Sequence, residues 1–204
     1  MNKKSLVYPV FFMFAVTAVF TLALAVLNHS TKEVISHNQN MEKMRKILYV
    51  FDLYRDGMPE KEIIDVFAFD IKSEKNEDGE EIYIYEKDGE IKAYGIPFSG
   101  PGLWGSITGY IGLNKDLNKV TGIEFLTQSE TPGLGGRISE PFYKEQFRGI
   151  DISSAGEKYI INRPAPGGNI DAISGATQTS AFVEKMINRG IEKFIEEGGV
   201  ADVR

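Results

Sequence analysis

Hydroxyl side chains gather in one short segment near the C-terminus, residues 171–180, which reads Asp-Ala-Ile-Ser-Gly-Ala-Thr-Gln-Thr-Ser. They belong to Ser174, Thr177, Thr179 and Ser180. Apolar residues recur at helical spacing directly afterwards and predict a helix over residues 179–197, with a buried face that contains Phe182, Met186, Ile187, Ile191 and Phe194. The free N–H groups and the partial positive charge at the start of a helix favour a bound phosphate. A helix cap requires only one hydroxyl, so capping and a phosphate-related role both stay open as interpretations.

Two further segments combine glycine with a conspicuous apolar residue. The first, residues 130–136, reads Glu-Thr-Pro-Gly-Leu-Gly-Gly and is a long turn in its simplest interpretation, because Pro-Gly is a turn signal. Leu134 stands out in it, since an apolar residue between glycines either packs inward or contacts a ligand. The second segment, residues 99–106, contains Trp104, the only tryptophan of the chain. Core packing and a ligand platform are both open interpretations for Trp104.

Composition limits the chemistry that the rest of the chain can add. The 204 residues include no cysteine, which excludes disulfides, thiolate metal sites, iron–sulfur clusters, cysteine nucleophiles, thioether-linked haem or flavin, and acylation as a lipoprotein. Hydrophobic residues make up 42% and charged residues 25%, which is ordinary for a globular protein. The net charge of −6 argues against a nucleic-acid partner, whose binding depends on neutralised phosphates.

The N-terminus carries an apolar run that predicts a transmembrane anchor. No residue from 6 to 27 is charged, and a helix of that length spans about 33 Å, enough to cross a hydrocarbon core of about 30 Å. Lys3 and Lys4 precede the run, so the positive-inside rule places the body of the protein outside the cytoplasm. Ala23-Leu24-Ala25 resembles a signal-peptide cleavage site, which keeps removal of the segment open. We expect residues 1–30 to form a single-pass anchor in the cell's inner membrane.

Two helices are predicted between the anchor and the first strand, in a connector that covers residues 31–80. One apolar face is expected to carry Met41, Met44, Leu48 and Phe51. The second helix opens at Met58-Pro59-Glu60, with Pro59 suited to the first helical position. Its buried face is expected to contain Ile63, Ile64 and Phe67. The charged stretch from 72 to 81 is predicted to be a solvated loop.

Alternating residues predict a mainly antiparallel sheet in residues 81–204. Strands are expected over 82–86 and 91–96, joined by a hairpin turn at Asp88-Gly89, and then over 106–113 and 120–127. A short helix is expected over 141–148. The predicted fold class is α+β, a single mainly antiparallel sheet with flanking helices, preceded by one N-terminal transmembrane helix.

The motifs resemble those of a known family, the FMN-binding domain. Residues 174–180, preceded by Asp171, are similar to its flavinylation motif, and residues 130–135 resemble its second hallmark. The domain occurs in the C subunit of the sodium-translocating NADH:quinone oxidoreductase (Nqr) and in the G subunit of the Rnf complex. Gly102-Leu103-Trp104, followed by Gly109-Tyr110, is more similar to the Nqr type. The resemblance covers nearly the whole chain.

The resemblance implies roles for individual residues. Thr177 matches the position that carries FMN through a phosphoester bond, as an attachment point rather than a catalytic residue. Asp171 is expected either to be recognised by a flavin transferase or to shape the loop. His29 and His37 lie far in sequence from the glycine-rich segments, which is compatible with a link through the phosphate. The other expected cofactor contacts are Leu103, Trp104, Glu130, Thr131, Gly133, Leu134, Gly135, Ser174, Gly175, Ala176, Thr179 and Ser180. No metal site is expected.

The resemblance also implies a function. The chain is expected to be an electron-transfer subunit of a membrane-bound, ion-translocating oxidoreductase complex of the Nqr or Rnf type. Its expected partners are the other membrane subunits of such a complex, the lipid bilayer, and a magnesium-dependent flavin transferase that installs FMN from FAD. Two alternatives stay open, a stand-alone or sensory membrane-anchored FMN-binding domain and a non-redox binding domain with purely structural loops.

Overall fold

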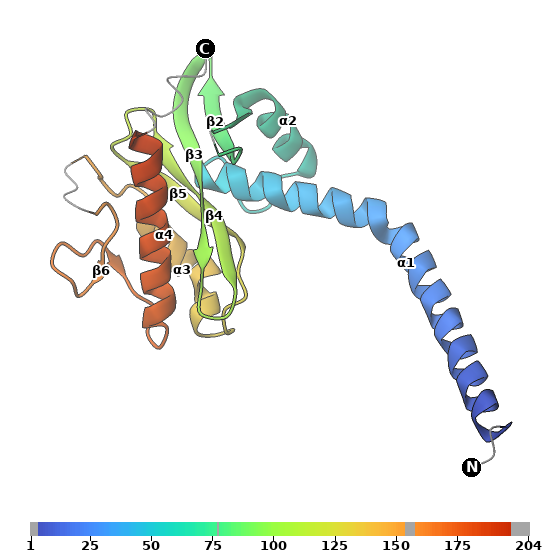
Figure 1. Ribbon diagram of the computed structural model, residues 1–204. Helices are drawn as coiled ribbons and strands as arrows, with labels where there is room; N and C mark the ends of the chain where they lie inside the picture. Colours follow the sequence, from blue (N-terminus) through green and yellow to red (C-terminus); the bar gives the residue numbers. More distant parts are fainter. Residues whose placement is uncertain (1–3, 77, 154–157, 197–204) are drawn as a thin grey trace. The chain divides into compact units, whose positions relative to one another are not determined.

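The computed structural model describes residues 4–76, 78–153 and 158–196. The chain divides into two compact units, Met1–Glu42 and Lys43–Arg204. Helix α1 (Lys4–Val50) begins in the first unit and ends in the second, as the elements labelled in Figure 1 show.

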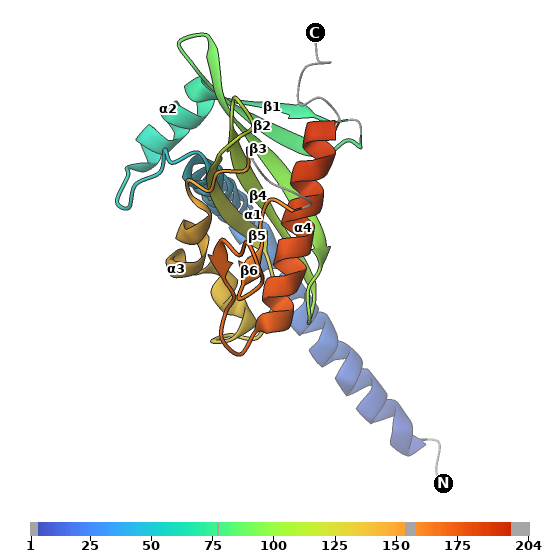
Figure 2. The same ribbon diagram turned by 90° about the vertical axis from the view of Figure 1, so that its left-hand side faces the viewer.

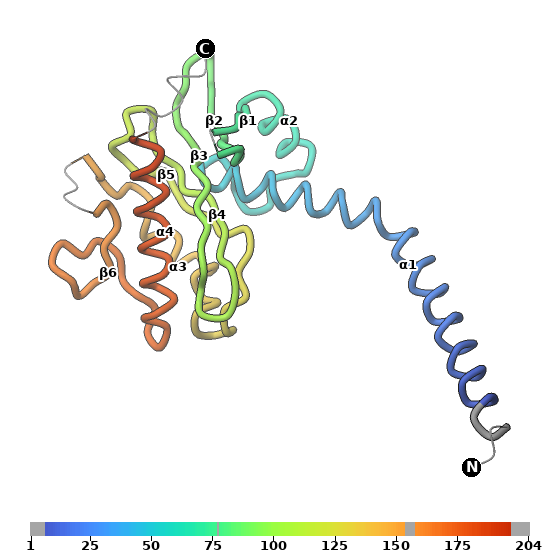
Figure 3. The backbone as a smooth tube through the Cα atoms, viewed as in Figure 1, coloured from blue at the N-terminus to red at the C-terminus, as the bar shows by residue number. Residues whose placement is uncertain are grey.

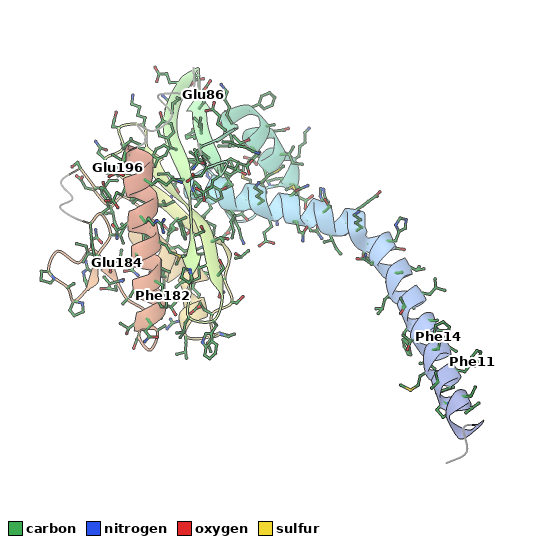
Figure 4. All side chains as sticks on the ribbon, in the orientation of Figure 1. Phe11, Phe14, Glu86, Phe182, Glu184 and Glu196 are labelled. Atoms are coloured by element: carbon green, nitrogen blue, oxygen red, sulfur yellow. The ribbon has the colours of Figure 1, made fainter. Side chains whose placement is uncertain are left out.

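The first unit consists of the long N-terminal part of α1. Its apolar side chains point outward, and Phe11 and Phe14, labelled in Figure 4, are 69% and 71% exposed. Within the described part of the chain, α1 is the one helix that is long and apolar enough to cross a membrane. The expected anchor thus has a candidate helix, and this helix continues without a break beyond the apolar run to Val50.

The second unit is built on a five-stranded antiparallel sheet. Its strands are β1 (Ile71–Lys75), β2 (Glu81–Lys87), β3 (Glu90–Pro101), β4 (Ser106–Asn114) and β5 (Val120–Thr127). They lie in the sheet in the order of the chain, and each pairs antiparallel with the next. Asp88 and Gly89, with φ angles of 54° and 77°, form the tight turn between β2 and β3. The predicted fold class and the predicted hairpin turn are both confirmed.

Helices cover both faces of this sheet. Helix α4 (Thr177–Glu196) lies along one face, whereas α2 (Glu60–Asp70) and the last turns of α1 lie on the other, as Figures 1 and 2 show from two sides. The core on the α4 side includes Ile96, Phe98, Ile111, Ile123, Val183, Ile187 and Ile191. Between α3 (Pro141–Lys144) and α4 the chain forms the short parallel pair β6 (Asn162–Arg163) and β7 (Ile170–Asp171); α3, β6 and α4 are labelled in Figure 3.

A row of glycines lets the end of α1 lie directly on the sheet. Gly95, Gly112 and Gly122 stand opposite one another in β3, β4 and β5. A Cβ atom at Gly112 or Gly122 would come within 2.9 or 2.8 Å of the carbonyl oxygen of Val50. The backbone of α1 therefore approaches the sheet more closely than any side chain at these positions would allow.

Arg148 closes the C-terminal end of α1, where carbonyl groups lack helical partners. Its guanidinium donates to the carbonyl oxygen of Tyr49 at 3.3 Å and to that of Thr121 at 2.5 Å, while the Thr121 hydroxyl donates to the carbonyl of Val50 at 2.9 Å. A cation at this end also interacts favourably with the helix dipole. Hydrogen bonds from Arg148 hold the pKa of Glu145 below its ordinary value.

We expect Arg148→Ala to lower the free energy of unfolding by about 2 kcal/mol, because the hydrogen bonds from a charged group to the Tyr49 and Thr121 carbonyls are lost. Urea unfolding followed by circular dichroism measures the change. Because the pKa of Glu145 is lowered in the folded protein, its ion pair stabilises the fold at neutral pH and loses its contribution as the pH falls through that lowered pKa. Acidification should therefore lower the free energy of unfolding less in Arg148→Ala than in the wild type. An equal decrease in both proteins would contradict a stabilising role for the ion pair between Arg148 and Glu145.

Some sequence-based boundaries are wrong. Residues 72–75, predicted as part of a charged loop, form most of β1, because an edge strand exposes its side chains and tolerates charge. Strand β3 extends to Pro101, beyond the predicted end at residue 96, so the first residues of the segment 99–106 belong to a strand. Helix α4 begins at Thr177 rather than Thr179, and Glu197 lies outside the described residues.

The predicted helix faces also need correction. In α2, Ile63 is fully buried but Ile64 is 40% exposed, since this helix covers the sheet with a narrow face. Phe182 of α4 is only partly buried and packs at the margin of the core. Pro59 is the N-cap of α2 rather than its first helical residue, with an extended backbone. The predicted helix over 141–148 is the short helix α3 followed by a single 3-10 turn, Glu145–Phe147.

Candidate functional site

A pocket of about 490 Å³ opens where three segments of the second unit converge. The segments are the turn between β3 and β4, the chain that follows β5, and the first turn of α4. The lining residues are Leu103, Trp104, Glu130, Thr131, Leu134, Gly135, Gly175, Ala176, Thr177, Gln178 and Thr179. The volume lies in the range of about 300–1,000 Å³ that is typical of ligand sites. The three segments singled out by their glycines and hydroxyls therefore meet at one place.

The hydroxyl of Thr177 is exposed at the edge of this pocket. Thr177 is the first residue of α4, where the backbone N–H groups of the first turn have no partner within the helix. Ala176, directly before it, is buried in the core and fixes the start of the helix against the sheet. An exposed hydroxyl thus stands next to the positive end of a 20-residue helix.

The two hydroxyls that follow are buried and already bonded. Thr179 is 1% exposed, and its Oγ1 donates to Oε2 of Glu130 at 2.6 Å. Ser180 is fully buried, accepts from the backbone N–H of Ile173 at 3.0 Å and donates to the carbonyl of Ala176 at 3.2 Å. Ser180 therefore ties the loop before α4 to the first turn of the helix. It is not a helix cap, because its oxygen accepts from an N–H that precedes the helix and leaves the free N–H groups of the first turn without that partner.

Glu130 connects all three segments of the pocket. Its Oε1 accepts hydrogen bonds from the backbone N–H groups of Leu103 at 2.8 Å and Trp104 at 3.0 Å. Its Oε2 accepts the bond from Thr179. The residue is 5% exposed, so this is a buried carboxylate with three donors. Burial of a charge requires such compensation.

Apolar side chains form the exposed walls of the pocket. Trp104 is 70% exposed, Leu103 48% and Leu134 45%. Leu134 lies against Gly175, where a Cβ atom would be 3.1 Å from Leu134 Cδ2. Of the two interpretations of Trp104, the structure excludes core packing, because the ring points away from the core. Large exposed apolar side chains beside a pocket are typical of a binding surface.

Four of the expected site residues lie outside the pocket lining: Gly133, Ser174, Ser180 and Asp171. Asp171 is exposed and pairs with Arg163 at 3.0 Å, while its backbone N–H donates to Gln146 at 2.7 Å. Gln178 lines the pocket although it was absent from the expected contacts. Its position between Thr177 and Thr179 in the hydroxyl-rich segment is the signal that could have identified it.

The chemistry of the lining favours binding over acid–base catalysis. Of the described residues that line the pocket, Glu130 alone is ionisable, and its oxygens are bonded within the chain. No cluster of metal-ligating side chains occurs in residues 4–76, 78–153 and 158–196. A second cavity of about 590 Å³ lies beside β5, but its buried charges, Glu124 and Lys144, pair with each other.

Part of the chain matches the model of a known domain family. Residues 102–192 match the family model of the FMN-binding domain. The matched stretch contains every residue that lines the pocket. The resemblance expected from the motifs is thereby confirmed.

Individual relatives are more specific. The chain is 38% identical over 106 residues to the C subunit of the Na(+)-translocating NADH-quinone reductase of Pasteurella multocida, a match that covers 49% of this chain and 41% of the relative. It is 34% identical over 110 residues to the corresponding protein of Neisseria meningitidis, a match that covers 51% of this chain and 43% of the relative. The matched region thus spans less than half the length of these curated relatives.

Solved structures share the fold. The C subunit of the Na(+)-translocating NADH-quinone reductase from Parabacteroides distasonis superposes with a TM-score of 0.67 at 26% identity, covering 81% of this chain and 96% of that one. NqrC from Shewanella oneidensis superposes with a TM-score of 0.63 at 21% identity, covering 80% of this chain and 95% of that one. The fold of the chain is that of these two proteins.

Proposed function

We propose that this chain is an electron-transfer subunit that carries one FMN in the pocket, attached through its phosphate to Thr177. The observation that carries the proposal is the exposed Thr177 hydroxyl at the start of α4, on the edge of a pocket of ligand size. A phosphate joined there lies next to free N–H groups and the positive end of the helix dipole. The match of residues 102–192 to the FMN-binding domain supports FMN as the phosphate-bearing group.

The residues present fit both ends of such a cofactor. Thr177 and the first turn of α4 suit the phosphate, whereas Leu103, Trp104 and Leu134 offer apolar surface to a flat ring. When bound, FMN supplies reversible electron transfer, which no side chain of this pocket provides. The side chains bind and orient the group, since the pocket has no free acid or base among its described residues.

The attachment is an ester between the Thr177 oxygen and the phosphorus of FMN. With FAD as the donor, the Thr177 oxygen bonds to the phosphate that carries the flavin, the bond between the two phosphates breaks, and AMP leaves. The hydroxyl proton is released in the same reaction. A magnesium-dependent flavin transferase is the proposed catalyst, and exposed Asp171 is a proposed part of the surface that it recognises or of the loop that presents Thr177.

The proposed setting is a membrane complex of the Nqr type. Support comes from the Nqr relatives of Pasteurella and Neisseria and from the apolar helix α1. In this proposal residues 1–30 anchor the chain in the inner membrane, residues 31–80 connect, and residues 81–204 bind FMN on the extracytoplasmic side. Electrons pass to and from the other membrane subunits of the complex.

Co-expression with a flavin transferase tests the proposal. Denaturing electrophoresis viewed under ultraviolet light should reveal a fluorescent band at the size of the chain, because only a covalent flavin survives denaturation. Intact-mass measurement should give the chain plus one FMN less one water, and also distinguishes a retained anchor from a cleaved one. A chain that stays dark and unmodified contradicts the covalent link.

Leu134→Ala should change the flavin more than the fold. Leu134 is 45% exposed, so its truncation is expected to cost less than about 1 kcal/mol of unfolding free energy. Loss of its apolar surface exposes the bound ring to water, and the flavin absorption spectrum and midpoint potential should shift. Phe69→Ala is the matched control, because Phe69 is an exposed apolar residue of α2 outside the pocket. An identical potential in both variants would mean that Leu134 does not contact the ring.

A further inference from the structure

The carboxylate of Glu130 is buried between the segments that line the pocket and is hydrogen-bonded to two of them. Both oxygens accept hydrogen bonds, two at Oε1 from the Leu103 and Trp104 N–H groups and one at Oε2 from Thr179. All three partners are donors, which matches a group that only accepts when ionised. Hydrogen bonds to an ionised acceptor are about twice as strong as neutral ones. The bonds therefore join the turn after β3 to the first turn of α4 through a single side chain.

Two glycines make room for this carboxylate. A Cβ atom at Gly102 would lie 2.6 Å from Oε1 of Glu130. A Cβ atom at Gly135 would lie 2.8 Å from Oε2 and 2.7 Å from Oγ1 of Thr179. Any other residue at either position would displace the carboxylate or break one of its bonds. The glycines of two separate segments thus serve the same buried group.

We infer that Glu130 is a positioning residue, which fixes the backbone of the Leu103–Trp104 turn against α4 and so sets the shape of the pocket. It is only 5% exposed and its oxygens are occupied, which leaves little of it to contact a ligand. The inference deepens the proposed function and depends on it only for the identity of the ligand.

The arrangement explains how an exposed aromatic ring is kept at the edge of the pocket. The ring of Trp104 is 70% exposed and gains little from packing, yet its backbone N–H is bonded to a buried carboxylate. Fixing the backbone reduces the entropy that the turn loses when a ligand binds, which is preorganisation. Without Glu130 the turn is expected to move away from α4 and the pocket to lose one wall.

Amide hydrogen exchange at Leu103 and Trp104 tests the inference in the full chain without flavin. In Glu130→Ala both amides should exchange at least about tenfold faster than in the wild type, because each loses a bond to a charged acceptor. In Glu130→Gln an amide oxygen can still accept, so a smaller but measurable acceleration is expected. Glu130→Gln is the deciding variant, since it keeps the shape of the side chain if Glu130→Ala does not fold.

Glu124→Gln is the matched control. Glu124 is another buried glutamate, earlier in the sequence, and it pairs with Lys144 rather than with the turn. The substitution should lower stability yet leave the exchange of the Leu103 and Trp104 amides at the wild-type rate. The inference is overturned if those amides exchange equally fast in the wild type and in Glu130→Gln, or if Glu124→Gln accelerates them as much as Glu130→Gln.

A second measurement uses the flavin-loaded chain. Trp104 is the only tryptophan, so its emission and its quenching by a nearby flavin report on this turn alone. Glu130→Gln should weaken that quenching, and unchanged quenching counts against the inference.

Thr177→Ala separates the two proposals, since it removes the proposed link but should keep wild-type exchange at Leu103 and Trp104. If the chain never binds FMN, yet the Leu103 and Trp104 amides exchange faster in Glu130→Gln than in the wild type, the proposed function is wrong and the inference about Glu130 stands.

Discussion

Thr177→Ala is expected to abolish covalent attachment of flavin while the domain stays folded. The other hydroxyls of the segment are poor substitutes. Thr179 is 1% exposed and donates to Glu130, and Ser180 is fully buried with two bonds of its own. Ser174 is exposed, but it precedes α4 and lies outside the pocket lining. Thr177 is exposed, and substitutions at exposed positions usually cost about 0.5 kcal/mol or less, which a folded domain tolerates. The effect on modification should therefore be complete and the effect on stability small.

The measurement compares wild type, Thr177→Ala and Thr177→Ser after co-expression with the transferase. Intact mass and in-gel fluorescence report the modification, and circular dichroism reports the fold. Thr177→Ser keeps a hydroxyl in the same place and should retain at least part of the flavin. Covalent FMN on the alanine variant would show that the attachment site lies elsewhere.

The second large effect, a loss of stability, is expected at the buried ion pair between Lys144 and Glu124 of β5. Lys144 Nζ lies 2.5 Å from Oε2 of Glu124, and both side chains are about nine-tenths buried. The same ammonium stands 4.3 Å from the centre of the Tyr49 ring. Lys144→Met keeps much of the length of the side chain but leaves the carboxylate of Glu124 buried without its cation. Breaking a buried pair in this way costs about 3–5 kcal/mol, so the unfolding midpoint should fall steeply.

Equilibrium unfolding in urea measures this cost, and two further variants interpret it. Replacing both partners, Lys144→Met with Glu124→Leu, should restore much of the lost stability, because no charge is then left unpaired. Lys72→Met removes an exposed pair with Glu86 and should cost less than about 1 kcal/mol. A double variant that is as unstable as Lys144→Met would mean that packing, not the lone charge, causes the loss.

Local sequence patterns were sufficient for most of the fold. The hairpin at Asp88-Gly89 and the strand from Val120 to Thr127 follow from turn residues and alternation, which act between neighbours in the chain. Strand β1 could not be found in this way, because its side chains are charged and its pairing with β2 supplies the order. The start of α4 was predicted two residues too late, at Thr179, because Thr177 has no apolar side chain that would mark it as part of the helix.

For the site too, local sequence predicts some features, and contacts between distant residues determine the others. The sequence marks its three segments because glycines and hydroxyls are clustered within each one. Which hydroxyl can react depends on hydrogen bonds that the motif does not encode. Thr179 donates to Glu130, which is distant in the chain, and Ser180 accepts from the backbone of the loop before α4. The motif alone therefore predicts Thr179 and Ser180 as contacts beside Thr177 without distinguishing them. It likewise predicts Glu130 as a cofactor contact, with no sign of its bonds to the turn.

The order of the strands has a consequence for the timing of maturation. Each strand of the sheet pairs with its neighbour in the chain, so the contacts of β1 to β5 are local and are expected to form early in folding. Helix α4 packs on β3 although the two are far apart in the chain, so their contact closes a long chain segment and is expected to form later. Thr177 takes its place beside Trp104 and Glu130 only after that docking. We therefore expect a nascent or C-terminally truncated chain to present no acceptor, so that attachment of the cofactor marks chains that have completed folding.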